Sequence, residues 1–134
     1  LAESASRVSF HQGDAQILEV GFRNYDLVLA ANLIDRLPDP GRFLSGIHQR
    51  LVIGGILVIA SPFDWQEKFT PRNKWLGGYF KRGTPVTSLQ GMKQKLFNNF
   101  ELACEPKELE FVLRKTARTF NHGISQVTLW RRTS

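Results

Sequence analysis

The stretch Tyr25–Leu37, YDLVLAANLIDRL, indicates the fold class of this chain. Its apolar run ends abruptly at the polar Asn32. A short apolar run between polar residues is typical of a strand that is buried on both faces, as in a parallel sheet covered by helices. Asp39 and Pro40 then provide an N-cap and a first turn for the next helix. The stretch predicts a strand that ends at Asn32, at the edge where α/β sheets bind ligands.

The same unit repeats further along the chain. Gly54-Gly55 stops the preceding helix, and Ile56–Ala60 is predicted as a second buried strand that ends at Ser61-Pro62. Between the two strands, residues 39–51 carry apolar side chains at helical spacing on one face, namely Phe43, Leu44, Ile47 and Leu51. A helix between two parallel strands is a βαβ unit. The chain therefore looks like part of a doubly wound α/β domain.

Weaker patterns flank this unit. Residues 7–12 (RVSFHQ) alternate well enough to predict a strand, which Gly13-Asp14-Ala15 closes. A helix is predicted from Ser88, as its cap, to about Asn98, with inward-facing Leu89, Met92, Leu96 and Phe97. The runs FELAC, LEFVLR and QVTLWRR predict a closing antiparallel section.

Composition narrows the class of protein. A chain of 134 residues with 42% hydrophobic content suits one packed domain, although it is short for a complete doubly wound sheet. The single cysteine, Cys104, indicates a reducing, cytoplasmic setting. No apolar run approaches the roughly 20 residues that cross a bilayer, so no membrane partner is expected.

Charge and histidine spacing exclude two further kinds of site. The net charge is +6. The basic residues are spread out, with modest concentrations at residues 68–82 and 114–118, so scattered surface charge is favoured and no nucleic-acid partner is expected. A local positive field that favours an anionic ligand or partner stays open. His11, His48 and His122 lack the spacing of metal ligands, so no metal is expected. The chain also contains neither a glycine-rich phosphate loop nor a nucleophile elbow.

Residues 61–87 interrupt the α/β rhythm. Prolines and glycines alternate there with four large aromatic residues, Trp65, Phe69, Trp75 and Tyr79. A loop of this length in a compact domain is usually functional. Aromatic faces can hold a flat heterocycle or a sulfonium cation, but the same residues can equally pack together as a small core of the loop itself. Both interpretations stay open.

Two polar residues at strand ends are candidate ligand contacts. Asp14 could accept a hydrogen bond from an exocyclic amine such as that of adenine, or it could form a turn or helix cap. Asn32 offers a donor and an acceptor at the mouth of the sheet, or it satisfies backbone groups there. Asp35 and Arg36 follow and could form a surface ion pair of little worth.

Taken together, GDA after the first strand, Asn32 before a proline-initiated helix, and LVIGGILVIASP resemble the class I S-adenosylmethionine-dependent methyltransferases. In that family the corresponding strands are the third, fourth and fifth. Three longer stretches, NLIDRLPDPGRFL, SPFDWQEKFTPRNKWLGG and FVLRKTARTFNHGISQVTLWRR, look like the methyltransferase domain of ovothiol-biosynthesis proteins. That domain methylates an imidazole nitrogen of a thiolated histidine, and the resemblance covers nearly the whole chain.

The resemblance implies roles for individual residues. Asp14 and Ala15 would contact the adenine of S-adenosylmethionine, and Asn32 would lie beside its methionyl part or the acceptor, as the candidate catalytic residue. Trp65, Trp75 and Gly77 would line the pocket of a small acceptor, a histidine derivative. As a separate hypothesis, Asp64 or Glu67 holds the ring's other nitrogen or the amino group of the acceptor.

The resemblance also implies that part of the domain is missing. The family's first strand, glycine-rich loop and second strand precede the GDA segment and are not in this chain. We therefore expect residues 1–134 to form a single partial domain with strands 3 to 7 of the order 3-2-1-4-5-7-6, mostly parallel with an antiparallel last strand. Weak or absent cofactor binding is expected. The alternative is a catalytically inactive half-domain that associates with itself or a partner through exposed sheet edges.

Overall fold

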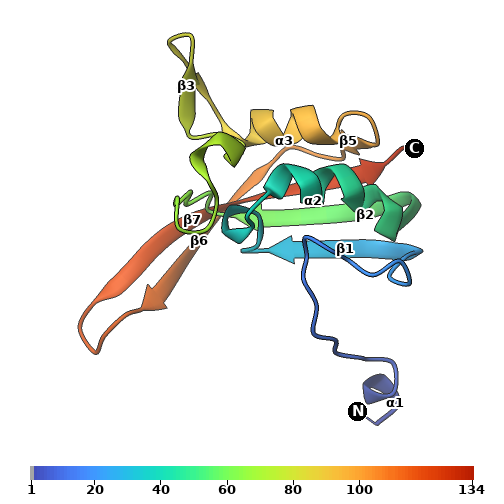
Figure 1. The fold of residues 1–134 in the computed structure, drawn as a ribbon. Helices are drawn as coiled ribbons and strands as arrows, with labels where there is room; N and C mark the ends of the chain where they lie inside the picture. The colour runs from blue at the N-terminus through green and yellow to red at the C-terminus, as the bar shows by residue number, and fades with distance from the viewer. Residues whose placement is uncertain (1) are drawn as a thin grey trace.

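The structure is a computed structural model that describes residues 2–134, and its centre is a mixed sheet with two helices on one face (Figure 1). The helical elements are α1 (Ala2–Ala5), η1 (Ile34–Arg36), α2 (Pro40–Gly46), η2 (Ile47–Arg50), η3 (Arg72–Lys74) and α3 (Ser88–Leu96). The strands are β1 (Tyr25–Ala31), β2 (Leu51–Ser61), β3 (Tyr79–Lys81), β4 (Thr84–Val86), β5 (Phe100–Leu102), β6 (Lys107–Arg114) and β7 (Phe120–Arg132).

The five-stranded sheet has the order β1-β2-β7-β5, with β6 paired to the first half of β7. Only β1 and β2 are parallel among the described strands, and all three pairings of β7 are antiparallel. The prediction of a mostly parallel sheet is therefore wrong. The reason is the length of β7, which spans 13 residues and pairs antiparallel with β2, β5 and β6. The predicted closing antiparallel section is confirmed.

Local sequence explains both main helices. The side chain of Asp39 accepts a hydrogen bond from the Arg42 N–H at 3.0 Å, and Pro40 occupies the first turn, as predicted. A capping box of Thr87 and Gln90 starts α3, so the cap is Thr87 and not Ser88. The helix ends at Leu96, and Phe97 after it is 71% exposed. The prediction that Phe97 faces inward is therefore wrong.

Residues 7–12 do not form the predicted strand and are exposed throughout. A strand needs a neighbour for its N–H and C=O groups. Within residues 2–134 the Arg7 and Val8 N–H groups instead bond back to Ser4 and Ala5 in turns. The assignment of this segment as the family's third strand is therefore wrong for this structure.

Gly54-Gly55 also differs from the prediction, because it lies inside β2 and not before it. The pairing with β1 jumps from Tyr25↔Leu51 to Leu27↔Ile56, so the extra residues bulge out of β2. Gly54 has φ +82°, which a residue with a side chain rarely adopts.

The core lies on one face of the sheet, under α2 and α3 (Figure 1). Leu57 and Ile59 of β2 are completely buried there, as are Met92 and Leu96 of α3. The opposite face is apolar but uncovered, with Leu27 56% and Leu29 62% exposed. We call it the bare face; the register places on it Leu27, Leu29, Ile56, Val58 and Leu129.

Candidate functional site

The carboxyl ends of β1 and β2 lie side by side, as the sequence predicts. The Asn32 N–H donates to the Ala60 carbonyl at 2.8 Å and extends the parallel pairing by one bond. Asn32 then turns the chain with φ +53°, a conformation that asparagine tolerates better than most residues. Its side chain is exposed at the sheet edge, where parallel strands place ligand contacts.

A polar network ties the segment after β1 to the segment after β2. The Asp35 carboxylate is buried and accepts a hydrogen bond from the Asp64 N–H at 2.8 Å. The Arg36 guanidinium lies 3.3 Å from that carboxylate and donates to both the carbonyl and the carboxylate of Asp64. Arg36 also lies over the ring of Phe69, at 4.7 Å. The Asp64 side chain is therefore held at the strand ends by Arg36 and by the Gln66 amide, which donates to it at 2.6 Å.

This network forms one wall of a cleft of about 640 Å³, and the β6–β7 hairpin forms the other. Phe111 and Gly123 are opposite each other in the hairpin, and a Cβ at position 123 would lie 2.4 Å from the Phe111 ring. A side chain at position 123 would have to displace that ring. The cleft is lined by Asn32, Asp35, Arg36, Pro62, Asp64, Phe111, Leu113, His122 and Gly123.

His122 also borders this cleft, although strand alternation points its side chain to the face of the hairpin opposite to that of Phe111. Its Nε2 lies 3.4 Å from the Glu110 carboxylate on the neighbouring strand. The cleft therefore combines amide, carboxylate and guanidinium groups on one wall with apolar side chains on the other. Sequence reasoning passed over His122 because it considered histidines only as metal ligands.

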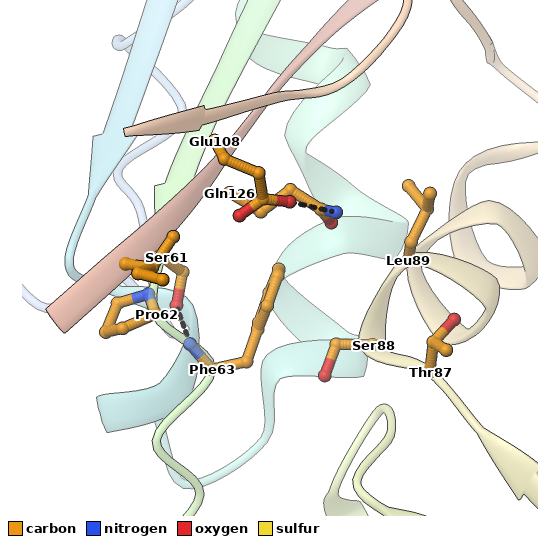
Figure 2. Close-up of a pocket in the computed structure, with 9 residues that line it drawn as sticks. Ser61, Pro62, Phe63, Thr87, Ser88, Leu89, Glu108 and Gln126 are labelled. Atoms are coloured by element: carbon orange, nitrogen blue, oxygen red, sulfur yellow. Dashed lines mark hydrogen bonds between the residues drawn. The ribbon is translucent and has the colours of Figure 1, made fainter. Parts of the chain in front are cut away.

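A smaller hollow of about 320 Å³ adjoins the cleft at Pro62 (Figure 2). Figure 2 shows the Phe63 ring between Ser61 at the end of β2 and Ser88 at the start of α3. The Ser61 hydroxyl accepts from the Phe63 N–H at 3.0 Å, and the Gln126 amide donates to Glu108 at 3.3 Å. These internal bonds leave the hollow with few unoccupied polar groups.

The aromatic residues of the 61–87 insert stack on one another. The Trp65 ring lies between those of Phe63 and Trp75, with centroids 6.4 and 6.3 Å apart. The indole N–H of Trp65 donates to Ser88 and that of Trp75 to the Thr70 carbonyl, both at 2.9 Å. Neither tryptophan lines the cleft. This is the packing that the alternative interpretation of the loop predicted.

Gly77 allows the backbone of the insert to pack closely against the start of α3. A Cβ at this position would lie 2.2 Å from the Ser88 nitrogen, so the backbones approach too closely for a side chain. Gly77 is buried and does not line the cleft. Of the predicted acceptor-side residues, only Asp64 therefore lines the cleft together with Asn32. Trp65, Trp75 and Gly77 lie outside it.

The predicted adenine contacts lie elsewhere. The Asp14 carboxylate accepts from the Gln16 N–H at 2.9 Å and forms a turn, the second of its two predicted roles. Ala15 packs against the core and lines a small hollow with Leu18 and Phe43, beside α2. Asp14, Ala15 and Asn32 do not border one common cavity. The structure therefore does not bring the predicted adenine contacts and Asn32 into one site.

The electrostatics of the helix cap are distinct from those of the cleft. The Arg42 N–H, which donates to Asp39, is the main reason why the pKa of that carboxyl lies below its ordinary value of 3.8. Burial acts in the opposite direction, and the ammonium groups of Lys74 and Lys95 lower the pKa further. Lys74 is 3.0 Å from Asp39 and ties the insert to the start of α2.

Metal-type clusters and membrane-spanning helices are both absent from residues 2–134. The described side chains include no group of three His, Cys, Asp or Glu residues arranged to hold a metal ion. None of the helices in that range is long and apolar enough to span a membrane.

Comparison with known proteins identifies the fold. No protein-family profile and no curated protein sequence matches the chain. Among solved structures, it is similar to a protein that converts a disulfide bond into a thioacetal group during echinomycin biosynthesis, with a TM-score of 0.64 at 14% identity over 98% of this chain and 59% of that chain.

Two methyltransferase structures are also similar. A SAM-dependent methyltransferase from Methanosarcina mazei gives a TM-score of 0.56 at 18% identity and covers 98% of this chain and 76% of that chain. The N-methyltransferase NodS from Bradyrhizobium japonicum, in complex with S-adenosylhomocysteine, gives 0.56 at 14% identity, over 99% of this chain and 60% of that chain. The chain thus spans about 60% of the length of several matched structures. At such low identity the likeness shows the fold alone, a Rossmann-like mixed α/β sheet like that of these methyltransferase structures.

Proposed function

We propose that this chain is the acceptor-side part of a cytoplasmic S-adenosylmethionine-dependent N-methyltransferase. We further propose that its acceptor is an imidazole nitrogen of a thiolated histidine, as in ovothiol biosynthesis. The observation that carries the proposal is the cleft at the carboxyl ends of β1 and β2, where Asn32 and Asp64 come together within a methyltransferase-type fold.

Orientation is the main task of such a cleft. When bound, S-adenosylmethionine supplies an electrophilic methyl group. The thiolate of the acceptor is a stronger nucleophile than its ring nitrogens, so nitrogen selectivity depends on how the ring is held. Precise alignment alone can supply about 7–11 kcal/mol of a reaction barrier. We assign this role to Asn32, whose amide can both donate to and accept from the ring.

The other lining residues support that assignment. Arg36 fixes the Asp64 carboxylate, which can then accept a hydrogen bond from the amino group or ring N–H of the acceptor. Phe111 and Leu113 provide apolar surface on the opposite wall. Trp65, Trp75 and Gly77 hold the insert against α3 and so support Asp64 from behind.

The test is an amide-resolved NMR titration of the chain with 4-mercaptohistidine. We expect shifts centred on Asn32, Asp64 and Gly123, which line the cleft. Asn32→Gly should remove most of the binding, because glycine accepts the positive φ of this position and only the side-chain amide is lost. Asn24→Gly is the matched control, since Asn24 also has a positive φ, of 65°, and lies outside the cleft. Shifts elsewhere, or equal affinity of the two variants, would overturn the proposal.

A second candidate function is association of a half-domain with a second copy. It is favoured by the bare face and by β1, which pairs with β2 alone among the described strands. Sedimentation velocity should then show a mass that rises with concentration. Leu29→Lys should abolish the rise, whereas Phe80→Lys, at a 74% exposed position on β3, should not. A monomer at all concentrations would exclude this function.

A further inference from the structure

The positive charge of the chain is concentrated in one segment. Residues 68–100, called the basic segment below, contain seven of the 18 Lys and Arg residues and no Asp or Glu. The other 101 residues hold eleven basic and twelve acidic side chains, so the basic segment accounts for the whole net charge of +6. Its basic residues are Lys68, Arg72, Lys74, Lys81, Arg82, Lys93 and Lys95.

The basic segment is one continuous region in space. It comprises η3, the β3–β4 hairpin and α3, which adjoin one another in Figure 1. Two acidic side chains approach it from outside: Asp39 binds Lys74 at 3.0 Å, and Glu67 lies 4.0 Å from Arg72. Within residues 2–134, Lys81, Arg82 and Lys93 take part in no ion pair. Most of the charge therefore remains available to an anionic partner.

An open cleft of about 600 Å³ lies within this region, lined by Arg72, Asn73, Trp75, Tyr79 and Lys81. The Arg72 guanidinium lies 5.6 Å from the Trp75 ring centroid. Tyr79 and Lys81 are two positions apart on β3, so their side chains share one face of the hairpin, while Phe80 points to the other. The cleft thus presents two cations and two aromatic rings together.

This combination suits a planar base that carries a phosphate. Guanidinium and ammonium groups bind phosphate oxygens, and aromatic side chains stack on bases regardless of sequence. We propose that the basic segment binds nucleotides through the cleft of Arg72, Trp75, Tyr79 and Lys81, within a single strand of nucleic acid or free in solution. The cleft is distinct from the one that contains Asn32, so its occupation is independent of the proposed methyl transfer.

The test measures fluorescence anisotropy of a labelled oligothymidylate of about 12 nucleotides, a length within the range of single-strand sites. The double variant Arg72→Glu with Lys81→Glu should weaken binding at least about ten-fold and reduce the salt dependence by roughly two ion equivalents. Lys115→Glu with Arg118→Glu is the matched control, because it changes the net charge equally at exposed positions outside the basic segment. That control should change the affinity little.

A second pair of variants separates stacking from charge. Tyr79→Leu should weaken binding on the order of ten-fold, because a stacking ring is lost from the cleft. Phe80→Leu, on the opposite face of β3, should leave the affinity unchanged. Circular dichroism of all variants checks that the fold is intact.

Competition identifies the source of the nucleotide. Displacement of the oligonucleotide by free nucleotide monophosphates points to a small-molecule site, and displacement by unlabelled strand alone points to nucleic acid; both support the cleft. Three results would overturn the proposal in favour of unspecific attraction to anions. They are equal losses of affinity in the two double variants, equal affinities of Tyr79→Leu and Phe80→Leu, and equally tight binding of phosphatidylserine vesicles.

Discussion

The two faces of the sheet are built from neighbouring residues of the same strands, yet only one is covered. Leu57 is completely buried under the helices, whereas Leu29 on the bare face is 62% exposed. Successive residues of a strand point to opposite faces, so a continuous apolar run provides apolar surface on both. The apolar pattern of a strand therefore predicts that both of its faces are suited to burial. In this chain, however, α2 and α3 cover only one of them.

The largest loss of stability is expected for a truncation on the face of the sheet that the helices cover. Leu57→Ala should lower the free energy of unfolding by about 3 kcal/mol, because it leaves a cavity in the core. Leu29→Ala, the matched variant on β1, should cost under about 1 kcal/mol. Urea unfolding of both variants measures the difference. Equal losses would mean that the bare face is buried in solution.

The next prediction compares a buried and an exposed carboxylate that both contact Arg36, namely Asp35 and Asp64. Asp35→Ala should cost about 2 kcal/mol, since it removes a buried carboxylate from the Asp64 N–H and from Arg36. Asp64→Ala removes a more exposed partner of the same guanidinium and should cost under about 1 kcal/mol. If Asp64→Ala proved the more harmful in urea unfolding, the network would not be organised around Asp35.

The smallest loss of stability is expected for removal of the Asp39 cap at the start of α2, and this loss depends on pH. Because the pKa of Asp39 is lower in the folded chain than its ordinary 3.8, the carboxylate stabilises the fold above that value, and this contribution is lost as the pH falls through the folded pKa. Asp39→Ala should therefore cost about 1 kcal/mol at neutral pH and progressively less in acid. Asp39→Ser keeps a cap without the charge. A pH-independent cost of Asp39→Ala would contradict the assignment.

Local signals predicted much of this fold. The apolar runs of β1 and β2, the Asp39 cap of α2 and the position of Asn32 at a strand end all depend on residues close together in the sequence. The predictions that were wrong required knowledge of distant partners. Residues 7–12 alternate like a strand, but alternation cannot show whether a neighbouring strand exists. Phe97 continues the apolar pattern of α3 beyond the point where the helix ends.

The site shows the same limit. Asn32 could be predicted because a strand end is a local feature. The burial of Asp35 could not, since its partner is the backbone of Asp64, 29 positions later, and nothing in LIDRL distinguishes a buried carboxylate from a surface ion pair. His122 borders the cleft only because the long β7 pairs with β6 beyond the sheet.

The most direct test of the account is an amide-resolved NMR titration of the chain with S-adenosylhomocysteine. The central claim is that this chain provides the acceptor side of a methyltransferase site and only separate parts of the cofactor site. We predict a dissociation constant on the order of millimolar or weaker. Any shifts should be confined to the cleft around Asn32 and Gly123. Micromolar binding that shifts Asp14 and Asn32 together would show one complete cofactor site and contradict the claim.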